Sequence, residues 1–462
     1  MTAAITSSFK NSLLTALSDA VNDADDNYYI GIGRAHDWND SDVAPIRDLE
    51  GDSDISSISF LNKVRNSLQS YKIVESNSLV LPRVNWVSNT IYYPYTDTAT
   101  EVDVSTNPYY VMNQNLRVYI CLEQPKDTSG NPQVSTVEPT GVQTASFKTA
   151  DGYVWKYMYQ IGPEDANNHM TNNYIPVQYI KGAGVTAVEV EQKSIQDSAV
   201  AGAILSIEIL DGGTGYINPV TVNILGSGTD AAASVNNNGG ILTHVTMNEV
   251  SGVIQHGSGY KDVTISFVGN GGGSGAKARA VIGPVSGITA DPTVSLRADS
   301  LMFHSDFVNS ENDTILTDND FRQSTLIKNP KKYGSLLDSD FTANAGNALF
   351  KLNFSDIVNP FNLDEEITGQ TSQAKALVAY YDGTSTPKQV WFYQTEETGF
   401  VDFNAGEQIL SNSGGEGTLQ SSNHLVDPDV DTKTGEILYI NNFTGISRDP
   451  DQTEDVKLVV KL

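Results

Sequence analysis

The sequence contains a single cysteine, Cys121, among its 462 residues. This residue stands inside the apolar run VYICL and has no basic residue on either side. A lone thiol can form neither an intrachain disulfide nor a zinc-thiolate cluster, and apolar surroundings disfavour the reactive thiolate. A disulfide framework is therefore excluded, and a reducing compartment fits the chain.

Basic residues and long apolar runs are scarce as well. The chain has 28 Lys and Arg against 56 Asp and Glu, a formal net charge of -28. A surface this negative repels phosphate backbones, so we expect no nucleic-acid partner. No run approaches the roughly 18 apolar residues of a membrane span, and the first twenty residues lack the apolar block of a signal peptide. We therefore expect the chain to have no membrane span and not to be secreted. We expect it to be synthesised in the cytosol.

What the chain has in abundance is glycine and tyrosine, 38 and 21 residues, together with many Asn, Ser and Thr. This composition, with short alternating apolar segments, predicts a mainly β fold. Apolar residues at steps of three and four predict one amphipathic helix over residues 5–21. A second helix is expected around residues 56–69, and strand-like segments continue from there to about residue 190.

The stretch VTVNILGSGTDAAASV at 220–235 carries the G-x-G-x-x-A spacing of a dinucleotide-binding loop, in Gly226, Gly228 and Ala231. Such a loop must open a helix whose N-terminus faces the pyrophosphate. Only DAAASV follows before NNNGG, too little for a crossover helix. The spacing recurs at Gly271, Gly273 and Ala276 and again ends quickly. We therefore interpret the glycines as turns between strands and expect no cofactor.

Two duplications account for much of the second half of the chain. In the first, over 201–283, the aligned pairs are Ile204 with Ile241, Tyr216 with Tyr260, Val220 with Val263 and Gly226 with Gly269. In the second, FNLDEEI at 361–367 recurs as FNAGEQI at 403–409. Each duplication predicts a small β module inserted into the chain.

Residue patterns typical of catalysis or metal binding are weak. The six histidines form no close pair of the H-E-x-x-H kind. Asp427, Asp429 and Asp431 alternate as calcium ligands can, but the sixth and twelfth loop positions hold Thr432 and Leu438 instead of Gly and Glu. We favour a solvated acidic loop over a cation site, and expect no catalytic and no metal residues. The aromatic clusters YYPY at 92–95 and WKYMY at 155–159 fit a sugar groove or, more commonly, a core.

Several segments, in order, resemble one family, the homodimeric baseplate wedge subunit of contractile-tailed, myovirus-type bacteriophages. They are YYIGIGRAHDW at 28–38, LPRVNW at 81–86, DGYVWKYMYQI at 151–161, TNNYIPV at 171–177, FRQSTLIKNP at 321–330, and GEILYINN with DQTEDVKLVV near the end. Together they span about three-fifths of the chain. Two positions depart from the family pattern, Asn441 in place of an acidic residue and Phe443 in place of arginine.

The resemblance implies a discontinuous β-sandwich or barrel-like core with an N-terminal helix and two inserted small β modules. The predicted segments are a first core part at 1–200, the duplicated Gly-rich insert at 201–283, a second core part at 284–350, the second insert at 351–415 and the C-terminal core part at 416–462. Insertions of this kind are tolerated where the two ends of a loop lie close together.

The function implied is structural: a non-enzymatic virion protein of the tail baseplate, made and assembled in the host cytoplasm. It would dimerise and join neighbouring wedge subunits, with a tail-fibre or fibre-adaptor protein as a further candidate partner. Motif positions suited to interface contacts are Arg34, Trp38, Arg83, Trp86, Trp155, Asp451 and Glu454; core or turn stabilisation is the alternative for each. In a rival hypothesis the inserted repeats recognise a host glycan or attach a fibre, and an enzyme such as a cell-wall hydrolase ranks third.

Overall fold

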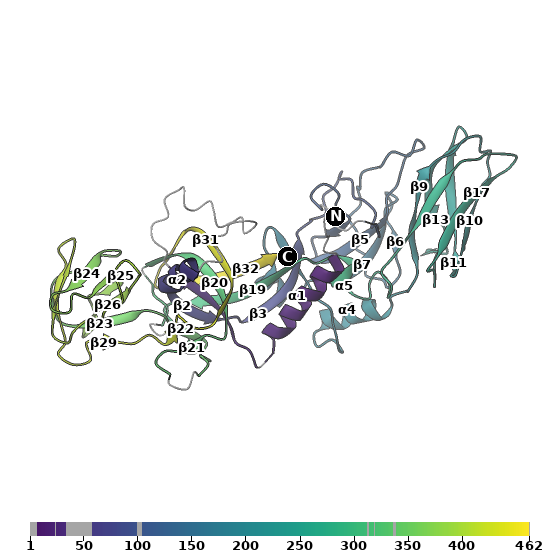
Figure 1. Cartoon of the computed structure of the whole chain (residues 1–462). Coiled ribbons are helices and arrows are strands. Elements are labelled where there is room, and N and C mark those ends of the chain that lie inside the picture. The colour runs from purple at the N-terminus through teal and green to yellow at the C-terminus, as the bar shows by residue number, and fades with distance from the viewer. Residues whose placement is uncertain are drawn as a thin grey trace. The chain divides into compact units, whose positions relative to one another are not determined.

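The computed structural model describes residues 7–23, 25–33, 58–98, 104–311, 314–317, 319–335 and 339–461. The chain forms two compact units, each built from separate segments (Figure 1). Unit 1 comprises Met1–Ser18, Ser78–Met302 and Val459–Leu462, and unit 2 comprises Asp19–Asn77 and Phe303–Leu458. The five-segment division expected from the sequence stays a prediction.

The mainly β fold class is confirmed, with an N-terminal helix, several sheets and a closed barrel. The five helices of the described residues are α1 (Ser7–Val21), α2 (Ile58–Ser67), α3 (Pro163–His169), α4 (Ala187–Asp197) and α5 (Pro292–Ser295). The first two were predicted. Helix α4 was missed, although its capping box, in which Thr186 and Glu189 bond each other's backbone N–H groups, is a signal that the sequence carries.

The core of unit 1 is a tyrosine-rich sheet of order β4-β5-β7-β6. Its strands are β4 (Tyr110–Met112), β5 (Arg117–Glu123), β6 (Phe147–Lys148) and β7 (Val154–Gln160). Trp155 on β7 is fully buried; its ring stacks on Tyr153 at 5.5 Å between centres and meets the edge of Tyr92 at 5.7 Å. Cys121 lies in the same cluster, and burial raises the pKa of its thiol well above its ordinary value. The lone thiol is therefore a packing residue.

The segment 201–283 forms a β module within unit 1, where Figure 1 labels its longer strands. A four-stranded sheet has the order β13-β12-β10-β17, and β18 pairs with β9. The strands are β9 (Ile204–Asp211), β10 (Val220–Gly226), β11 (Thr229–Ala231), β12 (Ala233–Asn238), β13 (Ile241–Met247), β14 (Glu249–Val250), β15 (Val253–Ile254), β16 (His256–Ser258), β17 (Val263–Gly269) and β18 (Lys277–Ile282). Strands β10 and β17 pair antiparallel from Val220 opposite Gly269 to Gly226 opposite Val263. Residues aligned in the duplication thus occupy equivalent places.

The dinucleotide-like glycines are strand connections, as predicted, because β11 and not a helix follows Gly228. The structure also supplies a reason for the spacing. The hydroxyl of Tyr260 accepts a long hydrogen bond, 3.4 Å, from the backbone N–H of Ala231, while a Cβ added to Gly228 would lie 2.4 Å from the Tyr260 ring. Each Gly-x-x-Ala segment is therefore a dock for a tyrosine of the other repeat.

The second dock repeats this arrangement with the copies exchanged. The hydroxyl of Tyr216 accepts from the N–H of Ala276 at 3.4 Å, and a Cβ on Gly273 would lie 2.5 Å from the Tyr216 ring. Both tyrosines are buried, with 6% and 5% of their surface exposed. The duplicated halves hold each other through these two tyrosines.

Unit 2 is built on a sheet of order β22-β2-β1-β20-β31. Its strands are β1 (Tyr28–Gly33), β2 (Leu68–Ile73), β20 (Asn319–Lys328), β22 (Ala345–Asn347) and β31 (Glu436–Arg448), with the short pair β21 (Lys331–Lys332) and β30 (Val430–Asp431) beside it. Every residue of β1, the segment YYIGIG, is buried. Most of β19 (Ser300–Val308) and of β32 (Thr453–Lys461) also belongs to this unit. They are neighbours in a sheet of order β32-β19-β3-β8, whose other strands are β3 (Ser76–Pro82) and β8 (Tyr174–Val177).

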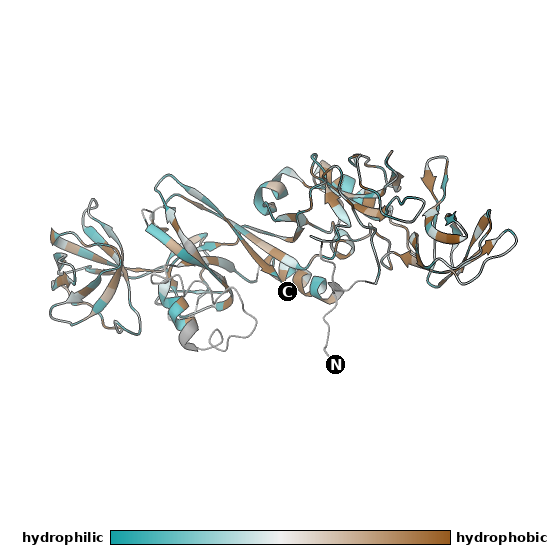
Figure 2. Ribbon diagram, turned by 90° about the horizontal axis from the view of Figure 1, so that it is seen from above, coloured by the Kyte–Doolittle hydropathy of each residue, from teal (hydrophilic) through white to brown (hydrophobic). Residues whose placement is uncertain are grey.

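Unit 2 also contains a closed six-stranded barrel. It comprises β23 (Phe350–Asn359), β24 (Glu366–Gly369), β25 (Lys375–Asp382), β26 (Lys388–Tyr393), β27 (Gln408–Ser411) and β28 (Glu416–Leu419), with β29 (Leu425–Val426) also paired to β23. Figure 2 shows hydrophobic and hydrophilic residues side by side on the strands, as expected of small β modules with one buried and one exposed face.

The second duplication lies in this barrel, and its two copies have the same environment. Phe361 and Phe403 are both in the barrel core. Glu365 and Glu407 are both buried, and each accepts a 2.6 Å hydrogen bond from the backbone N–H three residues earlier. The repeated glutamate is thus a loop-closing residue inside the barrel.

Candidate functional site

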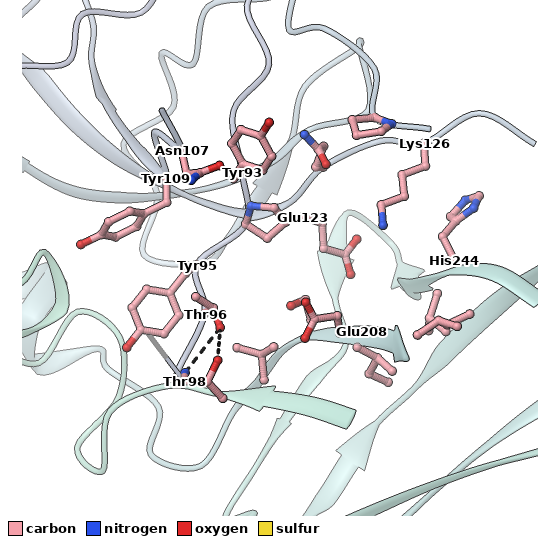
Figure 3. Close-up of a pocket in the computed structure, with 18 of the residues that line it drawn as sticks. Tyr93, Tyr95, Thr96, Thr98, Asn107, Tyr109, Glu123, Lys126, Glu208 and His244 are labelled. Atoms are coloured by element: carbon pink, nitrogen blue, oxygen red, sulfur yellow. Dashed lines mark hydrogen bonds between the residues drawn. The ribbon is translucent and has the colours of Figure 1, made fainter. Parts of the chain in front are cut away.

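A cavity of about 620 Å³ lies in unit 1, where the module 201–283 meets the tyrosine-rich sheet. Its lining comes from the chain around 93–132, from β9 and β13 of the module, and from Val281 and Arg297. Figure 3 shows Tyr95 and Tyr109 on one side, Lys126 and His244 on the other, and two glutamates between them. A mixed aromatic and polar lining is what small-ligand pockets present.

Aromatic rings and a guanidinium form one wall of this pocket. The guanidinium carbon of Arg297 lies 5.2 Å from the ring centre of Tyr95 and 5.5 Å from that of Tyr109, and Arg297 also donates to the carbonyl of Thr96. Burial raises the pKa of both phenols above the ordinary value. These tyrosines stay neutral, and the cation-π contacts fix the wall in place.

Glu123, at the end of β5, forms the floor of the pocket and is 7% exposed. Its Oε1 accepts a 2.7 Å hydrogen bond from the backbone N–H of Met247 on β13. Burial raises the pKa of this carboxyl to about 7, although the bond to Met247 and the charge of Lys148 act to lower it. The carboxyl both titrates near neutral pH and ties the sheet to the module.

Opposite the tyrosines stands His244, whose pKa is lowered by burial and by the neighbouring Lys126. The imidazole is therefore neutral around pH 7 and can donate and accept hydrogen bonds. With Glu123 and Glu208, it gives the pocket polar groups that suit a hydroxyl-rich ligand, while the tyrosine rings offer apolar faces.

Two further contacts fasten the module around the pocket. Arg279 of β18 pairs with Asp97 at 2.5 Å and with Glu208 at 2.9 Å. The second contact involves His256 of β16. Its Nδ1 donates to the carbonyl of Ile204 at 2.7 Å, and its Nε2 accepts from the hydroxyl of Ser146 at 2.8 Å. Burial lowers the pKa of His256, which agrees with a neutral ring in these roles.

Three of the predicted interface residues lie in unit 1. Trp155 is enclosed in the tyrosine cluster. Trp86 is half-buried and donates from Nε1 to the hydroxyl of Ser135 at 3.1 Å. Arg83 donates to the carbonyl of Thr171 at 3.0 Å and to Asn85 at 3.0 Å. Each makes contacts within the chain, and their role in an interface stays a prediction.

Of the other four predicted interface residues, two are described and differ in their surroundings. Glu454 is partly buried against Arg448, with 2.5 Å between Oε2 and Nε, whereas Asp451 is exposed. Arg34 and Trp38 lie outside the described residues. At the positions that depart from the family pattern, Asn441 pairs with Ser324 and Phe443 packs edge-on against Phe321.

The motif DGYVW owes its residues to a local turn. Asp151 accepts from the backbone N–H of Thr136 at 2.8 Å, from that of Val137 at 3.0 Å and from the hydroxyl of Ser135 at 3.0 Å. Burial acts to raise the pKa of Asp151, but these bonds and one from Thr149 lower it below its ordinary value. The aspartate therefore holds a neighbouring loop.

The acidic loop DPDVDTKTG uses its carboxylates in the same manner. Asp429 accepts from the N–H of Asn347 at 2.9 Å and Asp431 from that of Lys433 at 2.9 Å. Arg65 of α2 donates to three carbonyls of this loop, those of Thr432, Thr434 and Gly435. These bonds describe a loop tied to its own unit.

The sequence did not reveal a cluster of three possible metal ligands. Among the described residues, ligand atoms of His304, Asp306 and Asp455 lie within 4.8 Å of one another. The spacing His-x-Asp on an alternating segment was visible in the sequence, but its third member lies about 150 residues away and only the sheet brings it close.

The chain also resembles a known family over part of its length. A family model described as "Phage-Gp8: Bacteriophage T4, Gp8" matches residues 125–207, from the loop after β5 to the middle of β9. No protein with a curated description matches the chain. The match supports a baseplate protein of a myovirus, with a structural role in the virion tail and other baseplate subunits as partners. Within the described residues, no helix is long and apolar enough to cross a membrane.

Proposed function

We propose that this chain is a baseplate wedge subunit, which dimerises and joins neighbouring wedge proteins into the sixfold baseplate. The observation that carries the proposal is the match over 125–207, which covers the core strand β7 and the start of the module. Assembly takes place in the host cytoplasm. The chain acts mechanically and not as an enzyme: complementary surfaces hold one arrangement of wedges and repack as rigid bodies when the tail contracts.

Solution mass and location in the particle test this proposal. Light scattering of the purified chain is expected to give twice the 49.9 kDa of one protomer. Electron microscopy of intact particles is expected to place it in the baseplate. A monomer that is absent from the tail tip contradicts the proposal, and turnover of purified host envelope by the isolated chain contradicts the non-enzymatic part.

The pocket supports a second candidate function, recognition of a host glycan. Tyr93, which is 36% exposed, lines the pocket, and an exposed aromatic ring offers a face on which a sugar can stack. If this function is right, Tyr93→Ala abolishes binding to host glycans, while Tyr179→Ala, a similarly exposed tyrosine outside the pocket lining, leaves binding unchanged.

Deletion of 201–283 separates the two functions. Loss of adsorption with intact dimerisation and wedge assembly indicates that the module is a recognition device or a fibre attachment point. Failure of assembly indicates a structural module.

A further inference from the structure

A histidine and two aspartates meet on one side of two adjacent strands in unit 2. His304 and Asp306 are alternate residues of β19, and alternate residues of a strand share a face. Asp455 belongs to β32, the hydrogen-bonded neighbour of β19 in the order β32-β19-β3-β8. The three side chains come from two strands whose relative position the sheet fixes.

The distances between these side chains suit a shared small cation. Nε2 of His304 lies 3.1 Å from Oδ1 of Asp455 and 3.5 Å from Oδ1 of Asp306. Two ligands of a tetrahedral zinc ion, each at about 2.0–2.1 Å from the metal, are about 3.3–3.4 Å apart. The observed spacings fall on either side of that value.

Neighbouring groups hold two of these side chains in the required orientation. Nδ1 of His304 lies 3.4 Å from the hydroxyl of Ser76 on β3, the strand on the other side of β19. When Nδ1–H donates to that hydroxyl, the lone pair of Nε2 faces the carboxylates, the arrangement typical of metal-bound histidine. Lys457 binds Oδ2 of Asp455 at 2.6 Å, which leaves Oδ1 toward the histidine.

Burial is graded across the group. The His304 side chain is 3% exposed, whereas those of Asp306 and Asp455 are 39% and 45% exposed. The imidazole is therefore anchored in the protein, and the carboxylate side is open to an ion and to a water molecule. Imidazole together with carboxylates favours zinc over magnesium or calcium, which prefer all-oxygen sites.

We propose that unit 2 binds one zinc ion through Nε2 of His304 and the Oδ1 atoms of Asp306 and Asp455, with water in the fourth position. The ion links β19 to β32, two strands from distant parts of the sequence. Without a metal, the same geometry is a direct contact between the imidazole of His304 and the two carboxylates, and the experiment distinguishes the two.

The test titrates zinc into the full chain after treatment with a chelator. Because a chain of net charge -28 attracts cations nonspecifically, a matched control is needed. Asp340 provides it: like Asp455 it is 45% exposed and pairs with a lysine, Lys331, at 2.7 Å. We compare wild type, Asp455→Asn and Asp340→Asn by calorimetry, and repeat the titration with cobalt to detect the visible absorption of a tetrahedral ion.

The wild type and Asp340→Asn are expected to bind one equivalent and to melt at a higher temperature with zinc than without. Asp455→Asn is expected to bind at least about tenfold more weakly and to show no zinc-dependent rise. Its melting in chelator reports whether it folds; if it does not, Asp306→Asn takes its place. Absence of a saturable site in the wild type, or equal binding by Asp455→Asn and Asp340→Asn, overturns the proposal and leaves the metal-free contact.

Discussion

The two tyrosine docks of the module 201–283 make a quantitative prediction about glycine. In Gly228→Ala, the new Cβ would lie 2.4 Å from the carbonyl oxygen of Ser258 and 2.4 Å from a ring carbon of Tyr260. Ordinary contacts of this kind are about 3.4–4 Å, so a backbone oxygen and a buried ring must both move by about 1 Å. Overpacking of this size costs about 1–3 kcal/mol.

The equivalent change in the other dock costs more. Gly273→Ala meets the Tyr216 ring at 2.5 Å, and Gly273 also has φ of +108°, which an alanine adopts only with strain. Gly239→Ala isolates the strain, because φ there is +62° and nothing lies within 4 Å. Gly182→Ala, also with open space and without a positive φ, is the neutral control.

Scanning calorimetry of the full chain measures these differences. A loss of about 2 kcal/mol lowers the melting temperature of a unit of this size by about 4–8 °C. We expect the order Gly273→Ala, then Gly228→Ala, then Gly239→Ala, with Gly182→Ala unchanged. If Gly228→Ala and Gly273→Ala both have the same melting temperature as Gly182→Ala, the tyrosines do not pack on these glycines and the explanation of the Gly-x-x-Ala spacing is wrong.

Three further predictions follow from buried polar groups. Burial raises the pKa of Glu123 to about 7 from an ordinary 4.5, so the folded chain keeps a proton that the unfolded chain releases, and stability falls as pH rises through that window. Glu123→Gln keeps an acceptor for the N–H of Met247 but cannot titrate. Between pH 5 and pH 8 this variant should lose less unfolding free energy than the wild type, by up to about 3 kcal/mol, as measured by unfolding in denaturant. Arg448 is 2% exposed and donates to three backbone carbonyls as well as to Glu454; Arg448→Ala should cost about 3–5 kcal/mol in thermal or chemical unfolding, and a cost below 1 kcal/mol would show that the pair is not buried in solution. Tyr260→Phe removes only a long hydrogen bond and should cost less than about 1 kcal/mol, against about 3–5 kcal/mol for Tyr260→Ala.

Local features of this fold could be predicted from the sequence and non-local ones could not. Apolar spacing located α1, and the alignment of Val220 with Val263 located β10 and β17, because periodicity and duplication can be read from the local sequence. Closure of the barrel depends on β23 pairing with both β26 and β28, a long-range choice with no local signal. Helix α4 had a local signal in its capping box, but its apolar pattern is too short to indicate a helix.

The candidate pocket shows the same limit. Of the two aromatic clusters, WKYMY lies in strand β7 of the core, while Tyr93 and Tyr95 of YYPY line the pocket. Nothing in either cluster indicates this difference. It arises because residues of β9 and β13, more than 100 residues further along the chain, complete a pocket together with Tyr93 and Tyr95.

The contacts around that pocket bear on how the module can act in a baseplate. Glu123 with Met247, Asp97 with Arg279 and a further hydrogen bond from Ser146 fasten the module at three separate points. Because the contacts involve three different strands of the module, β13, β18 and β16, they oppose rotation of the module about any single one of them. If the tail contracts by repacking rigid bodies, the module moves together with the tyrosine-rich sheet. A ligand bound in the pocket would then touch both parts at once, so binding there would stabilise the docked arrangement and not release it.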